Sequence, residues 1–180
     1  PSDDNYQYLS LLQSRCARAG DLTCTDCHDP HQNDVTIGRN RSPQSDKLCT
    51  RCHQDIARNL TSHTHHPADS PGSRCLNCHM PRLDIPMGRY VTDHRITVPN
   101  PEATVALEIP NACSNCHRTE TPRWAARRFT ERYGHDPRGL LARTLTLTAL
   151  SRGEARAVEP GLRLLTDPRE SPPLRATVAT

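Results

Sequence analysis

The residues of this chain that can do chemistry are its cysteines and the histidines beside them. Residues 24–31 read CTDCHDPH, so two cysteines stand three apart and a histidine directly follows the second. This CxxCH pattern occurs four times and leaves only one of the nine cysteines, Cys16, unused. The four motifs are Cys24, Cys27 and His28; Cys49, Cys52 and His53; Cys75, Cys78 and His79; and Cys113, Cys116 and His117.

Each position of the motif fits covalent attachment of a c-type haem. Two thiols at this spacing reach the two vinyl groups of one macrocycle, and the adjacent histidine is then placed to ligate its iron. Four motifs therefore predict four haem c groups. Such large apolar bodies would also supply the interior that the chain lacks, since its hydrophobic content is 34% and its mean hydropathy is −0.75.

Three other uses of paired cysteines fit the pattern less well. Zinc ribbons use CxxC pairs, but they do not require a histidine after each pair, and these pairs are farther apart than usual ribbon spacing. A disulfide scaffold leaves the four histidines unexplained and needs an even number of cysteines. A thioredoxin-like site needs one CxxC in a strand–helix unit, which the sequence does not offer.

The six remaining histidines are candidates for the opposite face of each iron. Three residues span at most about 10 Å, too short for His31 to pass round the haem held by His28, so it suits a neighbouring haem. We predict His31, His63, His66 and His94 as the distal ligands. His63 and His66 are three apart in HTHHP and can reach separate irons, or one of them is a loop histidine; Met80 or Met87 is the alternative ligand type.

Two further side-chain types relate to the predicted haems. Cys16 is expected to be a buried thiol near the first haem; a bond to another chain or weak iron ligation are the alternatives. Haem propionates need cationic partners, and the arginines in the haem-bearing loops are suited to this role. They are Arg39, Arg41, Arg74, Arg82, Arg89 and Arg95.

The elements that must position these residues divide the chain in two. Sixteen prolines and eight glycines predict long irregular connections, so residues 1–118 should form a tetrahaem module: mostly irregular, with short α-helices around a stack of four haems and little β-structure. Residues 6–16, YQYLSLLQSRC, open it with a short apolar helix, and RYVTDHRITVPNP from residue 89 is the one extended piece.

Residues 119–180 predict a HEAT-like α-helical segment. Thr121 and Pro122 start a helix that Gly134 ends, and Asp136, Pro137 and Gly153 frame the next. A third short helix, a TDPRESPP turn and the start of a fourth follow. Stacked repeats need several units to bury their faces, so we expect this segment to be incomplete and the protein to continue; a self-contained cap is the alternative.

The order of these motifs resembles extracytoplasmic multihaem c-type cytochromes that carry TPR or HEAT repeats after the haem module. The resemblance covers roughly residues 9–160, through CTDCHDPH, HTHHP before CLNCHMP, TDHRITVPNP and NACSNCHRTETPRWAARRFTERYG. It implies bis-histidine haems, export from the cytoplasm and electron transfer. Some relatives form extracellular filaments, while Cys16 departs from the methionine often found there.

The function expected from these residues is electron transfer, with redox proteins, extracellular acceptors or copies of the chain as partners, in the periplasm or outside the cell. An oxidoreductase for a small nitrogen or sulfur compound, working at one open haem, is the alternative; a scaffold whose helices bind a partner is the third. The net charge of +3 is scattered, which argues against nucleic acid, and no apolar run is long enough to predict a membrane span.

Overall fold

The computed structural model describes residues 7–20, 22–29, 31, 43–85, 89–136 and 139–179. Helices make up most of this part of the chain, so the expectation of a mostly irregular module was wrong. The extra helices are α4 (Pro43–Thr50), which runs into the second motif, and α5 (Gln54–Arg58) and α6 (Leu60–Thr64), which lie between the second and third motifs. Each is short enough to end without a glycine or proline signal, so the sequence did not separate these helices from loops.

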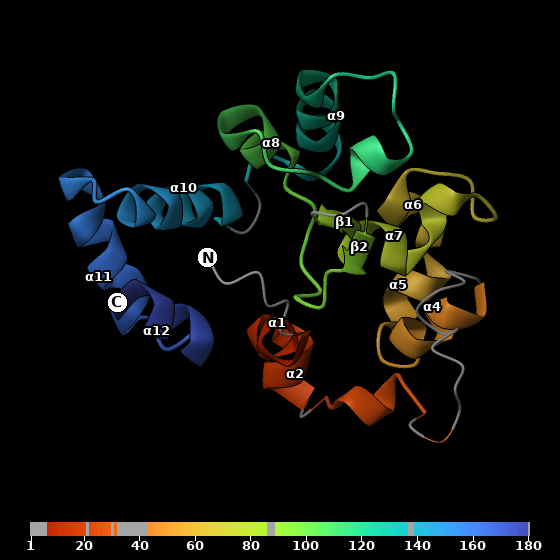
Figure 1. Ribbon diagram of the computed structural model, residues 1–180. Helices are drawn as coiled ribbons and strands as arrows, with labels where there is room; N and C mark the ends of the chain where they lie inside the picture. The colour runs from red at the N-terminus through yellow and green to blue at the C-terminus, as the bar shows by residue number, and fades with distance from the viewer. Residues whose placement is uncertain are drawn as a thin grey trace.

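A two-stranded antiparallel hairpin lies between the helices in Figure 1. Strand β1 (Arg82–Ile85) pairs with β2 (Arg89–Thr92), with Arg82 opposite Thr92. Strand β2 forms the first four residues of the predicted extended piece. Strand β1 was missed because RLDI has no run of β-formers, and its pairing with β2 makes it a strand.

The helices near the motifs lie on different sides of this hairpin. In Figure 1, α4 to α7 (Cys75–His79) lie on one side and α10 (Leu140–Ser151), α11 (Val158–Thr166) and α12 (Pro172–Ala179) on the other. Helices α8 (Pro101–Leu107) and α9 (Pro122–Tyr133) pack together at the top. The remaining helical segments are α1 (Gln7–Gln13), α2 (Arg15–Gly20), η1 (Cys24–Asp26), η2 (Pro71–Ser73), η3 (Cys113–Asn115) and η4 (Ala155–Ala157).

The C-terminal helices begin and end largely as predicted. The Thr121 side chain accepts a hydrogen bond from the Trp124 amide at 3.1 Å, Pro122 opens α9, and Gly134 ends it with φ of 85°. Helix α10 begins at Leu140, later than its predicted signal. The Asp136 carboxylate nevertheless caps it, because it accepts hydrogen bonds from the Leu141 and Ala142 amides.

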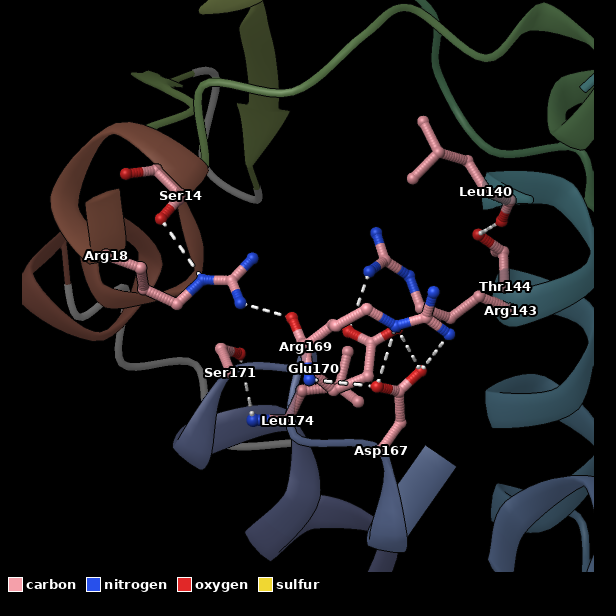
Figure 2. A network of polar contacts seen from close by, with 10 residues as sticks. All are labelled: Ser14, Arg18, Leu140, Arg143, Thr144, Asp167, Arg169, Glu170, Ser171 and Leu174. Carbon is pink, nitrogen blue, oxygen red and sulfur yellow. Dashed lines mark hydrogen bonds and ion pairs between the residues drawn. The ribbon is translucent and has the colours of Figure 1, made fainter. Parts of the chain in front are cut away.

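The last helix returns to the first and closes the structure. Helix α12 packs against α1, and the Arg18 guanidinium donates to the Arg169 carbonyl oxygen. Figure 2 shows this contact beside a second one, in which Arg143 of α10 pairs with Glu170 at 2.9 Å. The C-terminal helices are therefore tied both to one another and to the start of the chain.

Side chains alone build only a sparse core. Half of the buried hydrophobic residues among those described are alanines. The full set is Leu11, Leu76, Ala103, Ala112, Ala125, Phe129, Ala157 and Leu174. Larger groups remain outside, such as Val158 at 55% and Leu162 at 54% exposure. Within the described segments, no helix has the length and apolar character needed to cross a membrane.

The cap of α9 gives a test of this architecture. Thr121→Ala removes the hydroxyl that accepts from the Trp124 amide, so we expect the free energy of unfolding to fall by about 1 kcal/mol. Guanidinium titration of the haem-loaded protein, followed by far-ultraviolet circular dichroism, measures it. Thr121→Ser keeps the acceptor oxygen and should stay close to wild type; an equal loss in both variants would contradict a capping role.

Candidate haem-binding site

All four CxxCH motifs adopt the same local shape, a single helical turn. The amides of His28, His53 and His117 donate to the carbonyl oxygens of Cys24, Cys49 and Cys113, at 2.9, 3.0 and 2.9 Å. The third motif, Cys75–His79, is a helix in itself. Residues three and four apart on such a turn share one side, so each pair of thiols and its histidine can act on one ligand.

Three of the four motif histidines face a second histidine ring from elsewhere in the chain. The ring centres lie 6.2 Å apart for His28 and His94, with 31° between the ring planes. His63 and His79 are 6.0 Å apart at 17°, and His66 and His117 are 6.1 Å apart at 44°. The structure thus brings His94, His63 and His66, each predicted as a distal ligand, to a different motif.

This spacing equals that of two imidazoles on one metal ion. Two metal–nitrogen bonds of about 2 Å, plus about 1 Å from each nitrogen to its ring centre, place the two centres about 6 Å apart. Aromatic rings in direct contact have centres about 4.5 to 7 Å apart, so the distance alone fits both arrangements. The same separation recurs at three CxxCH histidines, each with a histidine from another segment, and this repetition favours an iron in a haem plane between the rings.

One histidine of each pair is also held in the tautomer that metal binding needs. The Nδ1 atoms of His94, His79 and His66 lie 2.9, 2.9 and 2.6 Å from the carbonyl oxygens of Thr92, Thr97 and Thr64. A carbonyl oxygen only accepts, so Nδ1 carries the proton and Nε2 keeps its lone pair. Such hydrogen bonds are the usual partners of metal-ligating histidines.

The second motif differs from the others. His53 and His31 are both exposed, and neither ring contacts another aromatic ring within the described residues. The His31 amide donates to the Asp29 carboxylate at 2.9 Å, which fixes a turn directly after the first motif. Of the four predicted distal ligands, His31 is the one that the structure does not place beside a motif histidine.

Burial and contacts among the cysteines shift the pKa values of several thiols. Burial, and then the nearby Cys113 and Cys116 thiolates, raise the pKa of Cys78 to about 11. A hydrogen bond between Cys49 and Cys75 raises the pKa of Cys75 and lowers that of Cys49. Cysteines from consecutive motifs therefore lie close together.

Burial, and then the Cys49 thiolate, raise the pKa of Cys16. Its other thiol neighbour, Cys52, also belongs to the second motif. Cys16 also raises the pKa of Cys27, so it lies between the first and second motifs rather than beside the first alone. The one cysteine outside the CxxCH motifs is therefore a half-buried thiol in the same region as the motif cysteines.

Three positioning residues escaped the sequence reasoning. The Trp124 ring lies 4.8 Å from that of His117, the Tyr133 hydroxyl donates to the His63 carbonyl oxygen at 2.8 Å, and Asp46 accepts from the Cys75 amide at 2.9 Å. Tyr133 follows Ala125 and Phe129 at intervals of one helical turn in the sequence, which was the available signal. Asp46 had none, because its partner is 29 residues away.

The remaining candidates have other partners or lie outside the described residues. His65 lies edge-on to Tyr133 at 5.3 Å, and Met80 caps α7. Arg74 pairs with Asp46 at 3.3 Å, Arg95 pairs with Asp93 at 2.6 Å, and Arg82 lies over the Tyr90 ring. Met87, Arg39, Arg41 and the Arg89 side chain fall outside the described residues.

The residues present fit haem c. The chain supplies paired thiols for covalent attachment, and three pairs of imidazole rings at the separation of two ligands on one metal ion. The side-chain core by itself is too sparse to fill the interior. Within the described segments, no cluster of three histidine, cysteine, aspartate or glutamate side chains could hold a bare metal ion. The arrangement therefore suits a metal that is already held by the four nitrogens of a macrocycle and needs only two ligands from the protein.

Comparison with known proteins agrees with this chemistry. Residues 60–135 match the family model described as Cytochrome c552, and residues 17–58 match the model of a doubled CXXCH motif. No curated protein and no solved structure significantly matches the chain. The two matches support a multihaem c-type cytochrome that binds its haem covalently through CxxCH motifs.

Intact mass spectrometry of the purified protein tests the number of attachment sites. We expect the measured mass to exceed the mass of the polypeptide by the mass of four haem groups. Cys49→Ala together with Cys52→Ala should lose one of them, because the second motif then has no thiol to offer the vinyl groups. Cys16→Ala is the matched control, since Cys16 lies near both residues but belongs to no motif; a haem lost in this control would contradict the assignment.

Proposed function

We propose that this chain is an electron carrier with four covalently bound c-type haems, each ligated by two histidines. The bound groups would supply one-electron chemistry between ferric and ferrous iron. The chain's own residues would attach them, hold both axial imidazoles and exclude water. The single observation that carries this proposal is the set of three histidine pairs, one at each of three motifs, whose ring centres lie 6.0 to 6.2 Å apart.

Two axial histidines favour electron transfer over catalysis. An iron with both axial positions taken by the protein has no place for a substrate, so it can only change its oxidation state. The carbonyl oxygens of Thr92, Thr97 and Thr64 hold the imidazoles in one orientation, which limits rearrangement when the charge on the iron changes. We assign His94 to the first motif, His63 to the third and His66 to the fourth.

His31 is our candidate for the fourth distal ligand, opposite His53. The Arg51 guanidinium donates to the Asp26 carbonyl oxygen at 3.1 Å, so the first and second motifs are neighbours. His31 follows Asp26 by five residues, which span at most about 17 Å. Within that reach, His31 can close on the iron held by His53 once the haem is attached.

A second candidate function comes from the same motif. His53 is exposed and contacts no aromatic ring within the described residues, so the iron that it would hold is the one suited to an exchangeable ligand. An open iron there would allow reduction or oxidation of a small nitrogen or sulfur compound. A third possibility for this position is a histidine from another copy of the chain, as in a cytochrome filament.

Location, partners and organisation complete the proposal. Since c-type cytochromes are typically extracytoplasmic, we place the chain in the periplasm or outside the cell, with redox proteins or extracellular acceptors as partners. We retain residues 1–118 as the tetrahaem module and residues 119–180 as a HEAT-like segment. The Cytochrome c552 match extends to residue 135, which includes α9 of that segment.

Carbon monoxide separates the two functions. We expect the optical spectrum of the reduced protein to stay unchanged when the gas is added, because all irons carry two protein ligands. A change in about one quarter of the haem absorbance would instead identify one open iron in four. Repeating the measurement at increasing protein concentration then distinguishes the sources, since a ligand from a second copy would suppress the change and an enzyme site would keep it.

Replacing single distal histidines tests the ligand assignment. Methionine opposite histidine raises the potential of a haem, so His63→Met, His66→Met and His94→Met should each move about one quarter of a potentiometric titration to higher potential. His65→Met is the matched control, because His65 lies in the same HTHHP stretch but faces Tyr133. A shift in this control as large as in the neighbours would contradict the pairing.

A further inference from the structure

We propose that the third haem site, formed by Cys75, Cys78, His79 and His63, is the junction at which the other three sites meet. This inference rests on the proposed haem sites and goes beyond them, because the motif order along the chain would allow a simple row. The third motif is linked to every other site, each time through a different set of residues.

The second site borders the junction through α4. Asp46 of this helix, which also carries Cys49, accepts a hydrogen bond from the Cys75 amide at 2.9 Å and pairs with Arg74 at 3.3 Å. The two charged side chains are only 13% and 15% exposed, so solvent screens their attraction little. The Cys49 and Cys75 thiols also lie near one another, because each shifts the pKa of the other. The second and third motifs are therefore neighbours on the side that carries their cysteines.

The fourth site borders the junction through two connections. His63 and His66 come from one short segment and face His79 and His117, so a single turn of chain would hold a ligand for each iron. On the attachment side, Cys78 is close to Cys113 and Cys116. In addition, the Asn115 side chain, inside the fourth motif, donates to the Arg82 carbonyl oxygen at 3.3 Å.

The first site reaches the junction through the segment after β2. His94, which faces His28, precedes Thr97 by three residues. The Thr97 carbonyl oxygen lies 2.9 Å from His79 Nδ1, and the Thr97 amide donates to the His79 carbonyl oxygen at 3.2 Å. One short piece of backbone thus holds the distal ligand of the first site and orients the proximal ligand of the third.

The first and second sites also meet directly. The Arg51 guanidinium donates to the Asp26 carbonyl oxygen at 3.1 Å and lies 3.7 Å from the Asp26 carboxylate, where exposed side chains make the ion pair itself weak. Because the contacts with the fourth site described above all come from the third, an electron travelling from the first or second site to the fourth would cross the third. In each step one electron leaves a ferrous iron, which becomes ferric, and enters a neighbouring ferric iron, which becomes ferrous; no bond or proton changes.

Electron traps at two sites test this arrangement. His63→Met would make the third site the highest in potential, and His66→Met would do so for the fourth. The oxidised, haem-loaded chain receives less than one electron per molecule from a photoexcited ruthenium tris-bipyridine complex. Loss of the long-wavelength absorption band of the methionine-ligated ferric haem then reports when the electron reaches the trap.

The junction predicts different kinetics in the two variants. In His63→Met every other site is one step from the trap, so a single fast phase is expected. In His66→Met electrons that enter the first or second site must pass through the third, so about half of the amplitude should become slower. Equal kinetics, or the slow phase in His63→Met instead, would overturn the junction. Absence of the methionine band in either variant would overturn the ligand pairing itself, a separate failure.

A second pair of variants tests the junction without His63→Met, in case that variant does not bind its full set of haems. In the His66→Met background, Asp46→Asn weakens the contact between the second and third sites, whereas Asp26→Asn weakens the surface contact between the first and second. We expect Asp46→Asn alone to slow about one quarter of the trapping amplitude further. If Asp26→Asn slows trapping as much, the route does not depend on the third site and the proposal fails.

Discussion

Pairs of imidazole rings separated by 6.0 to 6.2 Å impose the main constraint on this polypeptide. Each pair joins a motif histidine to a histidine 16 to 66 positions away along the chain, so the connections must bring distant segments face to face at a fixed separation. The hydrogen bonds from Nδ1 to the carbonyl oxygens of Thr92, Thr97 and Thr64 give these rings their orientation. The hairpin and the short helices between motifs are the means by which the chain reaches these positions.

The sparse side-chain core follows from the same constraint. A chain that encloses several large apolar groups does not need many leucines and phenylalanines of its own, and alanines at Ala103, Ala112 and Ala125 let backbone segments approach closely. Buried ion pairs take over part of the work of joining segments, as Asp46 and Arg74 do between the second and third motifs. Removal of the haems should therefore cost the fold most of its interior.

The C-terminal helices stabilise the site from outside. Helix α9 packs on α8, and its Trp124 and Tyr133 reach His117 and the His63 carbonyl oxygen. Helices α10 to α12 then lead back to α1, where Arg18 and Arg169 meet. The segment that looked like a separate repeat in the sequence thus contributes directly to the surroundings of one motif histidine, His117, and one predicted distal histidine, His63. Its last helix restrains the start of the chain.

The amino-acid sequence by itself determined the chemistry, because CxxCH is a local pattern: one helical turn brings its two thiols and its histidine together. The same holds for α9, whose cap at Thr121 and end at Gly134 are local signals. Sequence reasoning also proposed His63, His66 and His94 as distal ligands, but it had no means of matching them to motifs. Only the tertiary structure decided that His94 faces His28 and that Asp46 meets Cys75, because such contacts join residues far apart in the chain and depend on how every segment between them folds.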